Sequence, residues 1–398
     1  MRLFRALTIV CLGASGLQGQ VALNRLEVVA SGVSTDNGGN SWGPHKLRIV
    51  RTNAGVFTAY GVGPGPNHEV RLAQRTESGW KTIMRGSVGP PHTHLLARRD
   101  GSLIVIGWAP AEAPVVYTSN PQTGSSGALK IRWPDTWARG SREAAVIGPG
   151  DDLYILASYW QKPSGFYIAH WKAADGKWSF RNIRTGLHHA YAFLFPEADG
   201  PEWVADRDVH WEELGWKMPP PPGDFGAVFD GMRLWRWKGP KEGTLLREEP
   251  QTEDYLNVKC DQTDVYRDQL GRLHILYTLM GKTTTGQMTS RHMVLRADGT
   301  QEKDVALPGW GMWRTIQDAS GAFYFIFPDR HSDSLKVYGP SQDSLELGSP
   351  KVISLNGNHV DYQVFLATPR AGVPVADVVD GVFLSTDAKW VYFRLRLR

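Results

Sequence analysis

Cysteine is scarce in this sequence. The 398 residues contain two cysteines, and Cys11 lies in an N-terminal segment that we expect to be removed, so the mature chain keeps only Cys260. A single cysteine forms no intrachain disulfide, and the fold must then be stabilised by burial and hydrogen bonding. A lone thiol in an exported protein is either buried and inert or a metal ligand.

Excess charge and long apolar runs are also missing. The chain has 44 Lys and Arg against 40 Asp and Glu, a net charge of +4. So small an excess of positive charge does not indicate that the protein binds nucleic acid. Residues 1–19 begin with two arginines, an apolar run and small residues, which predicts a secretory signal peptide. The alternative is a buried N-terminal strand. No later segment approaches the ~20 apolar residues of a membrane helix. We therefore expect a secreted or periplasmic protein, without a membrane span, in which residues 20–398 form a single domain.

Several catalytic motifs are absent. The sequence has no glycine-rich phosphate loop, no G-x-S-x-G nucleophile motif and no Asp-box series of the sialidase type. It also has no convincing long amphipathic helix. These absences argue against a nucleotide-binding protein, an α/β-hydrolase and a sialidase.

What the sequence does contain is a recurring turn signal followed by an apolar or alternating strand. Seven such turns end or centre on glycines spaced 46 to 71 residues apart, at Gly55, Gly101, Gly150, Gly200, Gly271, Gly321 and Gly381. Seven units of about four strands predict an all-β fold, a seven-bladed β-propeller. The alternative is a β-sandwich with long loops. The last strand, KWVYFRLRLR, is expected to close the ring by pairing with the N-terminal segment.

Two of the hairpins carry chemically interesting residues at matching positions. His92 and Tyr191 each lie nine residues before the glycine of an Asp-Gly turn, and Trp108 and Arg207 each lie seven residues after it. Folding each hairpin about its turn predicts that Tyr191 and Arg207 are cross-strand neighbours at the open end. In a propeller these open ends meet around one mouth of the central channel.

A histidine, a tyrosine and an arginine suit β-elimination on a uronic acid. An arginine neutralises the carboxylate, a base removes the acidified C5 proton, and an acid protonates the departing glycosidic oxygen. The alternative is structural: Tyr191 and Arg207 form a packing pair, and His92 is a capped loop residue.

The segment PHTHLLARRDGSLIVIG and the tyrosine followed by an arginine sixteen residues later resemble motifs of the BNR-repeat propeller lyases that cleave ulvan, polysaccharide lyase families 24 and 25. The resemblance implies a seven-bladed propeller in which His92, Tyr191 and Arg207 are catalytic. The second histidine of those families is not matched, because Glu112 stands in its place. A carboxylate there adds negative charge near an anionic substrate.

Further residues are expected to contact the substrate. His94 competes with His92 for the position of the base, and His189 precedes Tyr191 by two residues. Glu112 is a candidate for binding sugar hydroxyls. Trp211 is a candidate stacking platform, because sugar C–H faces pack on aromatic rings.

A structural zinc ion is the second predicted site. His210, Cys260 and His274 supply ligand types that Zn²⁺ prefers, and the resemblance implies a zinc held by His and Cys from these regions. The fourth ligand is open. The alternative is that Cys260 is a buried small hydrophobe and His274 an ordinary strand residue.

The leading hypothesis is therefore a secreted lyase acting on an anionic, uronic-acid-containing polysaccharide that resembles ulvan. The second hypothesis is a propeller glycoside hydrolase that uses acids such as Glu112, Asp206 and Glu212. The third is a carbohydrate-binding BNR-repeat propeller without catalytic activity.

Overall fold

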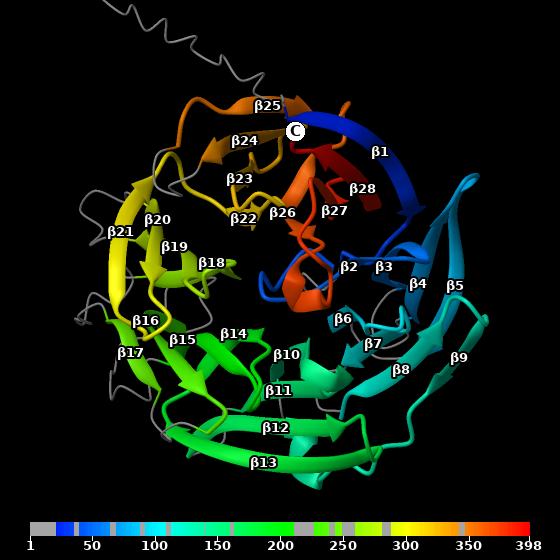
Figure 1. The fold of residues 1–398 in the computed structure, drawn as a ribbon, viewed down its shortest axis with the longest axis vertical. Coiled ribbons are helices and arrows are strands. Elements are labelled where there is room, and N and C mark those ends of the chain that lie inside the picture. The colour runs from blue at the N-terminus through cyan, green and yellow to red at the C-terminus, as the bar shows by residue number, and fades with distance from the viewer. Residues whose placement is uncertain are drawn as a thin grey trace, which may run out of the picture.

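Seven four-stranded antiparallel sheets surround a central channel in the computed structural model (Figure 1). This confirms the predicted seven-bladed β-propeller. The structure describes residues 21–35, 40–63, 69–87, 92–108, 113–139, 141–159, 163–210, 227–238, 243–248, 259–280, 288–341 and 347–398. The predicted signal peptide, residues 1–19, lies outside them. None of the helices in the described residues is long and apolar enough to cross a membrane.

The first four blades follow one another along the chain, each with its innermost strand first. Blade 1 contains β2 (Ile49–Thr52), β3 (Gly55–Val62), β4 (Glu69–Thr76) and β5 (Gly79–Ser87). Blade 2 contains β6 (His92–Ala97), β7 (Leu103–Trp108), β8 (Val115–Asn120) and β9 (Ser125–Ala128). Blade 3 contains β10 (Ser141–Ile147), β11 (Leu153–Tyr159), β12 (Ser164–Lys172) and β13 (Lys177–Gly186). Blade 4 contains β14 (His189–Phe195), β15 (Glu202–His210), β16 (Ala227–Arg236) and β17 (Thr244–Glu248).

The remaining blades keep this order, and short 3-10 helices occur only between strands of the described chain. Blade 5 contains β18 (Lys259–Arg267), β19 (Leu273–Met280), β20 (Met288–Leu295) and β21 (Gln301–Leu307). Blade 6 contains β22 (Arg314–Gln317), β23 (Phe323–Pro328), β24 (Ser334–Ser341) and β25 (Lys351–Ser354). Blade 7 contains β26 (Val360–Leu366), β27 (Val378–Ser385), β28 (Lys389–Arg396) and β1 (Ala22–Ser31). The 3-10 helices are η3 (Asp135–Arg139), η4 (Pro149–Asp151) and η7 (Pro369–Ala371).

The ring is closed by the two ends of the described chain. Strand β1 pairs with β28, so the first strand completes the last blade, as the sequence predicted. Figure 1 shows the blue β1 beside the red β28. This pairing covers the free edge of β28, which would otherwise expose unpaired backbone groups.

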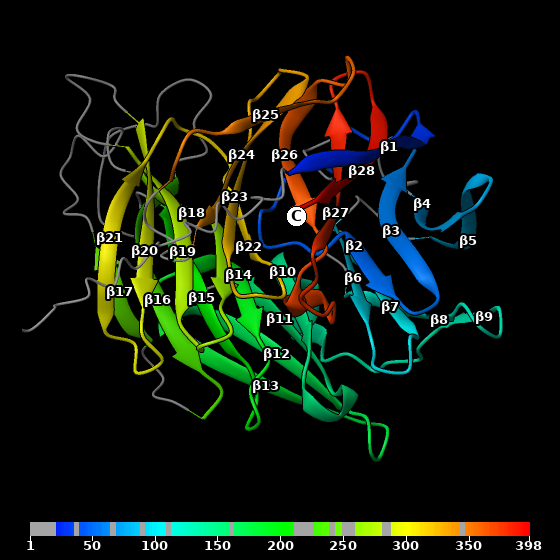
Figure 2. The same cartoon turned by 45° about the horizontal axis from the view of Figure 1, so that its top comes forward.

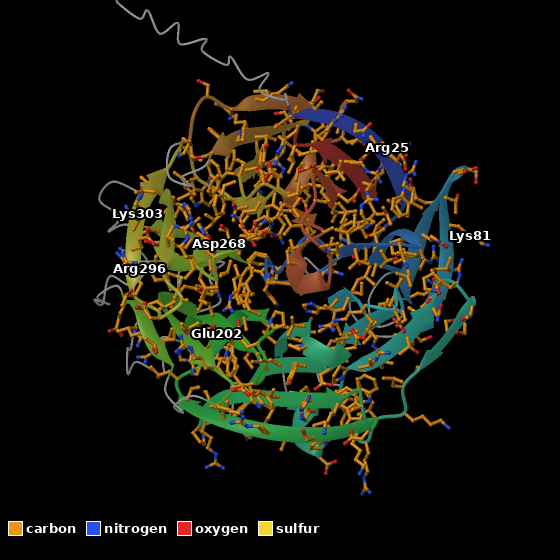
Figure 3. All side chains as sticks on the ribbon, viewed as in Figure 1. Arg25, Lys81, Glu202, Asp268, Arg296 and Lys303 are labelled. Carbon is orange, nitrogen blue, oxygen red and sulfur yellow. The ribbon has the colours of Figure 1, made fainter. Side chains whose placement is uncertain are left out.

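The core lies between neighbouring blades. Every residue of β11, β14 and β23 is buried, because these strands pack against another blade on both faces. Charged side chains gather at the periphery, where Figure 3 shows Lys81 and Lys303 on outermost strands.

The recurring turns have one geometry in blades 5 and 6. The N–H of Gly271 donates to the carbonyl of Asp268, and the N–H of Gly321 donates to that of Asp318. Both glycines have φ near +80°, at 79° and 87°, a conformation that favours glycine. The side chain of each aspartate also accepts two backbone N–H groups of its own turn. This explains why the predicted glycine signal marks the hairpins.

Candidate active site

The candidate site lies at the mouth of the channel where the innermost strands begin. Each blade repeats the same strand order, so residues at the start of these strands converge at one end (Figure 2). Contacts across blades confirm the convergence. The ring of Tyr191 from β14 lies 6.0 Å from that of Trp42 and 5.6 Å from that of His45, both in the segment before β2.

The predicted pairing in the second blade is confirmed. His92 is the first residue of β6, and its Cα partner is Trp108 in β7. Only the backbone of His92 belongs to the described part of the chain. Its position at the channel end of the innermost strand places it at the same mouth as Tyr191.

The predicted pairing of Tyr191 with Arg207 is wrong by two residues. The Cα partner of Arg207 is His189, which precedes Tyr191 by two positions. One residue of the shift comes from the turn, because six residues separate the paired Phe195 and Glu202, against five in the second blade. The other comes from a bulge between Ala190 and Phe193.

This bulge gives Tyr191 an unusual backbone. Its φ is +52°, in the left-handed region, where a residue with a large side chain is rare. The side-chain amide of Gln262, in the neighbouring blade, donates to the carbonyl oxygen of Tyr191 at 2.8 Å. The hydroxyl of Tyr191 accepts a hydrogen bond of 3.2 Å from the indole N–H of Trp42. Bulges re-aim side chains at functional sites, and here two neighbouring segments fix the re-aimed phenol.

Arg207 is held by a carboxylate on the outermost strand of its own blade. In the sheet, Arg207 of β15 lies opposite Gly231 of β16, which in turn lies opposite Glu248 of β17. Arg207 reaches across β16, and its Nη1 lies 2.9 Å from Oε1 of Glu248. The arginine is mostly buried and the glutamate about half exposed. The guanidinium is thus already oriented toward a carboxylate.

His94 belongs to the interior of the ring. It is fully buried, its Nδ1 accepts the N–H of Leu47 at 3.4 Å, and its Nε2 donates to the carbonyl of Glu143 at 3.0 Å. Burial, followed by the charges of Lys46 and Arg48, lowers its pKa well below the ordinary range. A neutral imidazole with both nitrogens engaged joins three blades and is shielded from solvent.

His189 is also an interior residue. It is 3% exposed, and its ring lies 4.8 Å from that of Trp235. Burial lowers its pKa to about 3. Its Nδ1 donates to the carbonyl of Leu187, so the ring is held within its own blade. The other predicted substrate contacts, Glu112 and Trp211, lie outside the described residues.

The three predicted zinc ligands do not fit one ion. Cys260 pairs with Leu279, whereas His274 pairs with Tyr266, six residues further along β18. At about 3.4 Å per residue, roughly 20 Å separates them. His274 instead bonds to His292 and Asp268, and Cys260 is buried. The side chain of His210 does not belong to the described part of the structure. Within that part, no group of three or more His, Cys, Asp or Glu side chains could hold a metal ion.

Asp206 belongs to a buried pair of acids. It is fully buried, and its pKa is raised well above the ordinary value by burial and by the charge of Asp261, to which it is hydrogen-bonded. Glycoside hydrolases keep their two carboxyl groups about 5 to 9.5 Å apart. Two carboxyl groups that are hydrogen-bonded to each other lie closer together than that, so this pair does not have the geometry of a glycoside hydrolase. Glu112 and Glu212, the other acids considered for hydrolysis, lie outside the described residues.

Sequence reasoning missed Trp42 and Tyr362, two of the aromatic residues near Tyr191. Trp42 lies in a segment without regular structure, and nothing in its sequence neighbourhood points to blade 4. Gln262 was noticeable only through its place near the start of an innermost strand. Tyr362, in β26, is also at this mouth, with its ring 5.2 Å from that of Trp42.

No protein-family model matches this sequence, and no curated protein matches it. Among solved structures, an ulvan lyase of polysaccharide lyase family 25 is similar at 11% identity with a TM-score of 0.60, covering 93% of this chain and 95% of that one. The same lyase bound to a unit of glucuronic acid and sulfated rhamnose gives 0.61. An oligogalacturonate lyase from Vibrio parahaemolyticus is 9% identical, with a TM-score of 0.53 over 95% of this chain and 98% of that one. At these identities the similarity concerns the fold.

Proposed function

We propose that this protein is a secreted polysaccharide lyase that cleaves a uronic-acid-containing polymer by β-elimination. The observation that carries the proposal is the placement of Tyr191. Trp42 donates to its phenol and Gln262 to its backbone carbonyl at the channel mouth, and Tyr191 lies two residues along β14 from the partner of Arg207. The similarity of the fold to polysaccharide lyases supports the same conclusion.

In the proposed reaction Arg207 binds the uronate carboxylate. The ion pair with Glu248 is partly exposed, and exposed ion pairs contribute only about 0.2–1 kcal/mol, so a substrate carboxylate can replace Glu248. Neutralising the carboxylate acidifies the C5 proton, because the carbanion that forms is stabilised by the neighbouring cation. This step requires a base at the same mouth, and His92 is the candidate.

Tyr191 is the proposed acid. The indole of Trp42 donates to the phenol oxygen, so the phenol's own proton is directed to another acceptor. The base takes the C5 proton, the C4–O bond breaks, a C4–C5 double bond forms, and the phenol protonates the departing glycosidic oxygen. Atoms and charges balance once Tyr191 regains a proton from the base or from water.

The test is turnover of uronates. The protein is incubated with ulvan and with polygalacturonate, and the ultraviolet absorbance of the unsaturated uronate is followed together with the number of new reducing ends. A lyase raises both signals. New reducing ends without the chromophore would indicate a hydrolase, and glycan binding without either signal would indicate a binding propeller. Either result, obtained with folded protein, overturns the proposal.

A further inference from the structure

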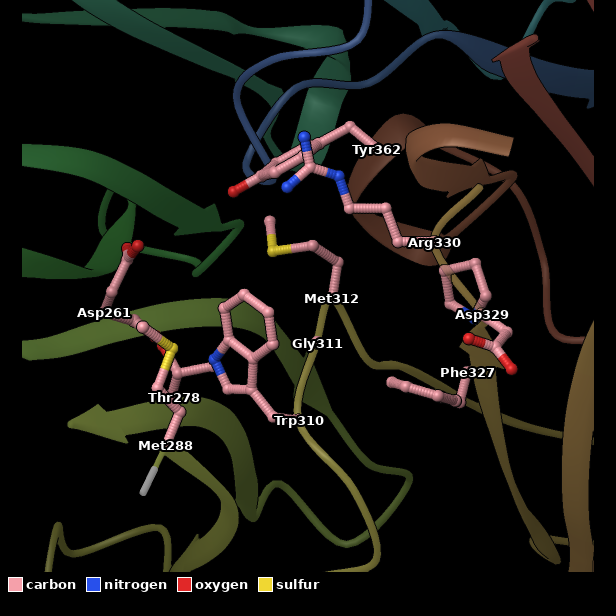
Figure 4. Close-up of a pocket in the computed structure, with 11 residues that line it drawn as sticks. Asp261, Thr278, Met288, Trp310, Gly311, Met312, Phe327, Asp329, Arg330 and Tyr362 are labelled. Carbon is pink, nitrogen blue, oxygen red and sulfur yellow. The ribbon is translucent and has the colours of Figure 1, made fainter. Parts of the chain in front are cut away.

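A small cavity opens beside the candidate site. It has a volume of about 240 Å³ and is lined by residues of blades 5, 6 and 7, among them Asp261, Trp310, Met312, Arg330 and Tyr362. Figure 4 shows Trp310 and Met312 in the middle of the cavity, and Arg330 beside Tyr362 on one side of it. The volume is smaller than that of a pocket for a drug-sized ligand and suits a single sugar ring.

Trp310 gives the cavity an exposed aromatic surface. Its side chain is 46% exposed, whereas Met312 and Phe327 beneath it are buried. The loop that carries Trp310 is anchored, because the N–H of Gly311 donates to the hydroxyl of Ser290. A Cβ on Gly311 would lie 2.7 Å from the ring of Phe327, so the loop packs closely on the blade. An exposed tryptophan on a rigid loop is a platform for the apolar face of a sugar.

Arg330 is the cationic side chain among the residues that line the cavity, which also include the acids Asp261 and Asp329. Its guanidinium lies 5.2 Å from the centre of the Tyr362 ring, and its Nε donates to the carbonyl of Asp361. Within the described part of the chain no carboxylate forms an ion pair with it. The turn is fixed by backbone hydrogen bonds from His331 to Val360 and from Val360 to Ser332. Asp329, which also lines the cavity, is paired with Lys336. Arg330 therefore presents a held fork of donors that is not engaged in an ion pair, which suits a carboxylate or a sulfate.

The cavity lies close to the site around Tyr191. The ring of Tyr362 lies 5.2 Å from Trp42, and the ring of Trp42 lies 6.0 Å from Tyr191, so Tyr362 and Tyr191 are within about 11 Å of each other. One oligosaccharide can span both. A larger cavity, of about 630 Å³, lies at the turn ends of blades 4 and 5. Its arginines are already paired with acids, so it offers no comparable site.

We infer that this cavity is a subsite for an anionic sugar unit next to the unit that reacts. Trp310 stacks on the sugar ring, and Arg330 binds its carboxylate or sulfate group. The inference rests on the proposed function for the identity of the polymer, but it concerns binding, which is measurable without turnover.

The test measures binding and steady-state kinetics in parallel. Dissociation constants for ulvan and polygalacturonate oligosaccharides are measured by calorimetry, with each substitution made in a protein that also carries Tyr191→Phe. KM is measured with each substitution made in the otherwise wild-type protein. Arg330→Gln and Trp310→Ala should each weaken binding of longer oligosaccharides about tenfold and raise KM with kcat little changed. Disaccharides should be affected less. The control variants are Arg184→Gln, exposed on β13, and Leu270→Ala, 75% exposed at the opposite rim.

Chemically altered oligosaccharides identify the anion. If Arg330 binds a sulfate, desulfated oligosaccharides should bind the wild type as weakly as intact ones bind Arg330→Gln. If Arg330 binds a carboxylate, carboxyl-reduced oligosaccharides should show this weakened binding to the wild type instead. Weaker binding in both variants without any lyase product would support the subsite and overturn the proposed reaction. Normal turnover with KM and affinity equal to those of the controls would overturn the subsite alone. Absence of binding to the wild type would overturn both the subsite and the proposed function.

Discussion

The guanidinium of Arg207 crosses over Gly231 to reach Glu248, with 2.9 Å between Nη1 and Oε1. A carboxylate of the protein therefore occupies the place that the proposed reaction assigns to a carboxylate of the substrate. Between the two residues, a Cβ on Gly231 would lie 2.6 Å from the carbonyl oxygen of Arg247, so glycine lets β16 and β17 approach closely at this point.

Replacing this carboxylate should improve substrate binding. Glu248→Gln keeps the shape of the side chain but removes the charge that competes for Arg207. Because partly exposed ion pairs contribute about 0.2–1 kcal/mol, KM for a uronate polymer should fall by about 1.5- to 5-fold with kcat nearly unchanged. Glu302→Gln, which removes a carboxylate paired with other arginines, is the control. An unchanged KM would argue against Arg207 as the carboxylate-binding residue.

Removing the phenol should abolish most of the turnover without unfolding the protein. Tyr191→Phe deletes the proposed acid, and general acid catalysis contributes about 10²- to 10⁴-fold, so the initial rate of chromophore formation should fall by at least about a hundredfold. Trp42→Phe keeps an aromatic ring but deletes the N–H that donates to the phenol. A neutral hydrogen bond contributes about 0.5–1.5 kcal/mol, so the loss should be only about 2- to 10-fold. Circular dichroism verifies the fold, and equal rates for Tyr191→Phe and wild type would exclude the acid role.

Gln262 should act as a positioning residue for Tyr191. Gln262→Met keeps the volume of the side chain and removes the donor to the Tyr191 carbonyl. The freed tyrosine should lower kcat more than it raises KM, and the midpoint of thermal unfolding should fall, because a buried unpaired carbonyl costs about 1–3 kcal/mol. Thr263→Val, at the next residue of the same strand, removes a buried hydroxyl that bonds to Leu276. It should affect stability alone. Parallel losses of kcat in both variants would refute a specific role for Gln262.

Stability should decrease in acid because of Asp318. Burial opposes its ionisation, but hydrogen bonds from Arg398 and from its own turn outweigh burial and lower its pKa to about 2. A carboxyl whose pKa is lower in the folded state stabilises the protein above the unfolded value of 3.8, and this contribution is lost as the pH falls toward about 2. Asp318→Asn should lower the melting temperature near neutral pH and flatten its dependence on pH over that range. Parallel curves for variant and wild type would show that Asp318 contributes nothing to acid sensitivity.

Local patterns in the sequence predicted the architecture well, because turns and strand closure depend on local chemistry. The glycine-marked turns, the seven blades, the pairing of His92 with Trp108 and the closing strand follow from residues close in sequence or from the repeat itself. The bulge at Tyr191 could not be predicted in the same way. Its left-handed backbone is stabilised by Gln262, 71 positions away, so the counting rule that worked for His92 placed Tyr191 opposite the wrong partner.

The candidate site was predicted in part for the same reason. The positions of Tyr191 and Arg207 in adjacent strands of one blade follow from the hairpin. The burial of His94 and His189 does not, since it depends on Glu143 and Trp235 from other strands. The separation of Cys260 from His274 depends on the register of β18 and β19, which the spacing in sequence does not reveal.

The pairing of β1 with β28 has a consequence for how the molecule is assembled. The earliest strand to be synthesised has no partner until almost the whole chain has followed it, so the circle stays open throughout translation. Contacts between such distant segments form slowly, and an open circle exposes strand edges that invite association with other chains. We therefore expect the joining of β1 to β28 to be the last step of folding.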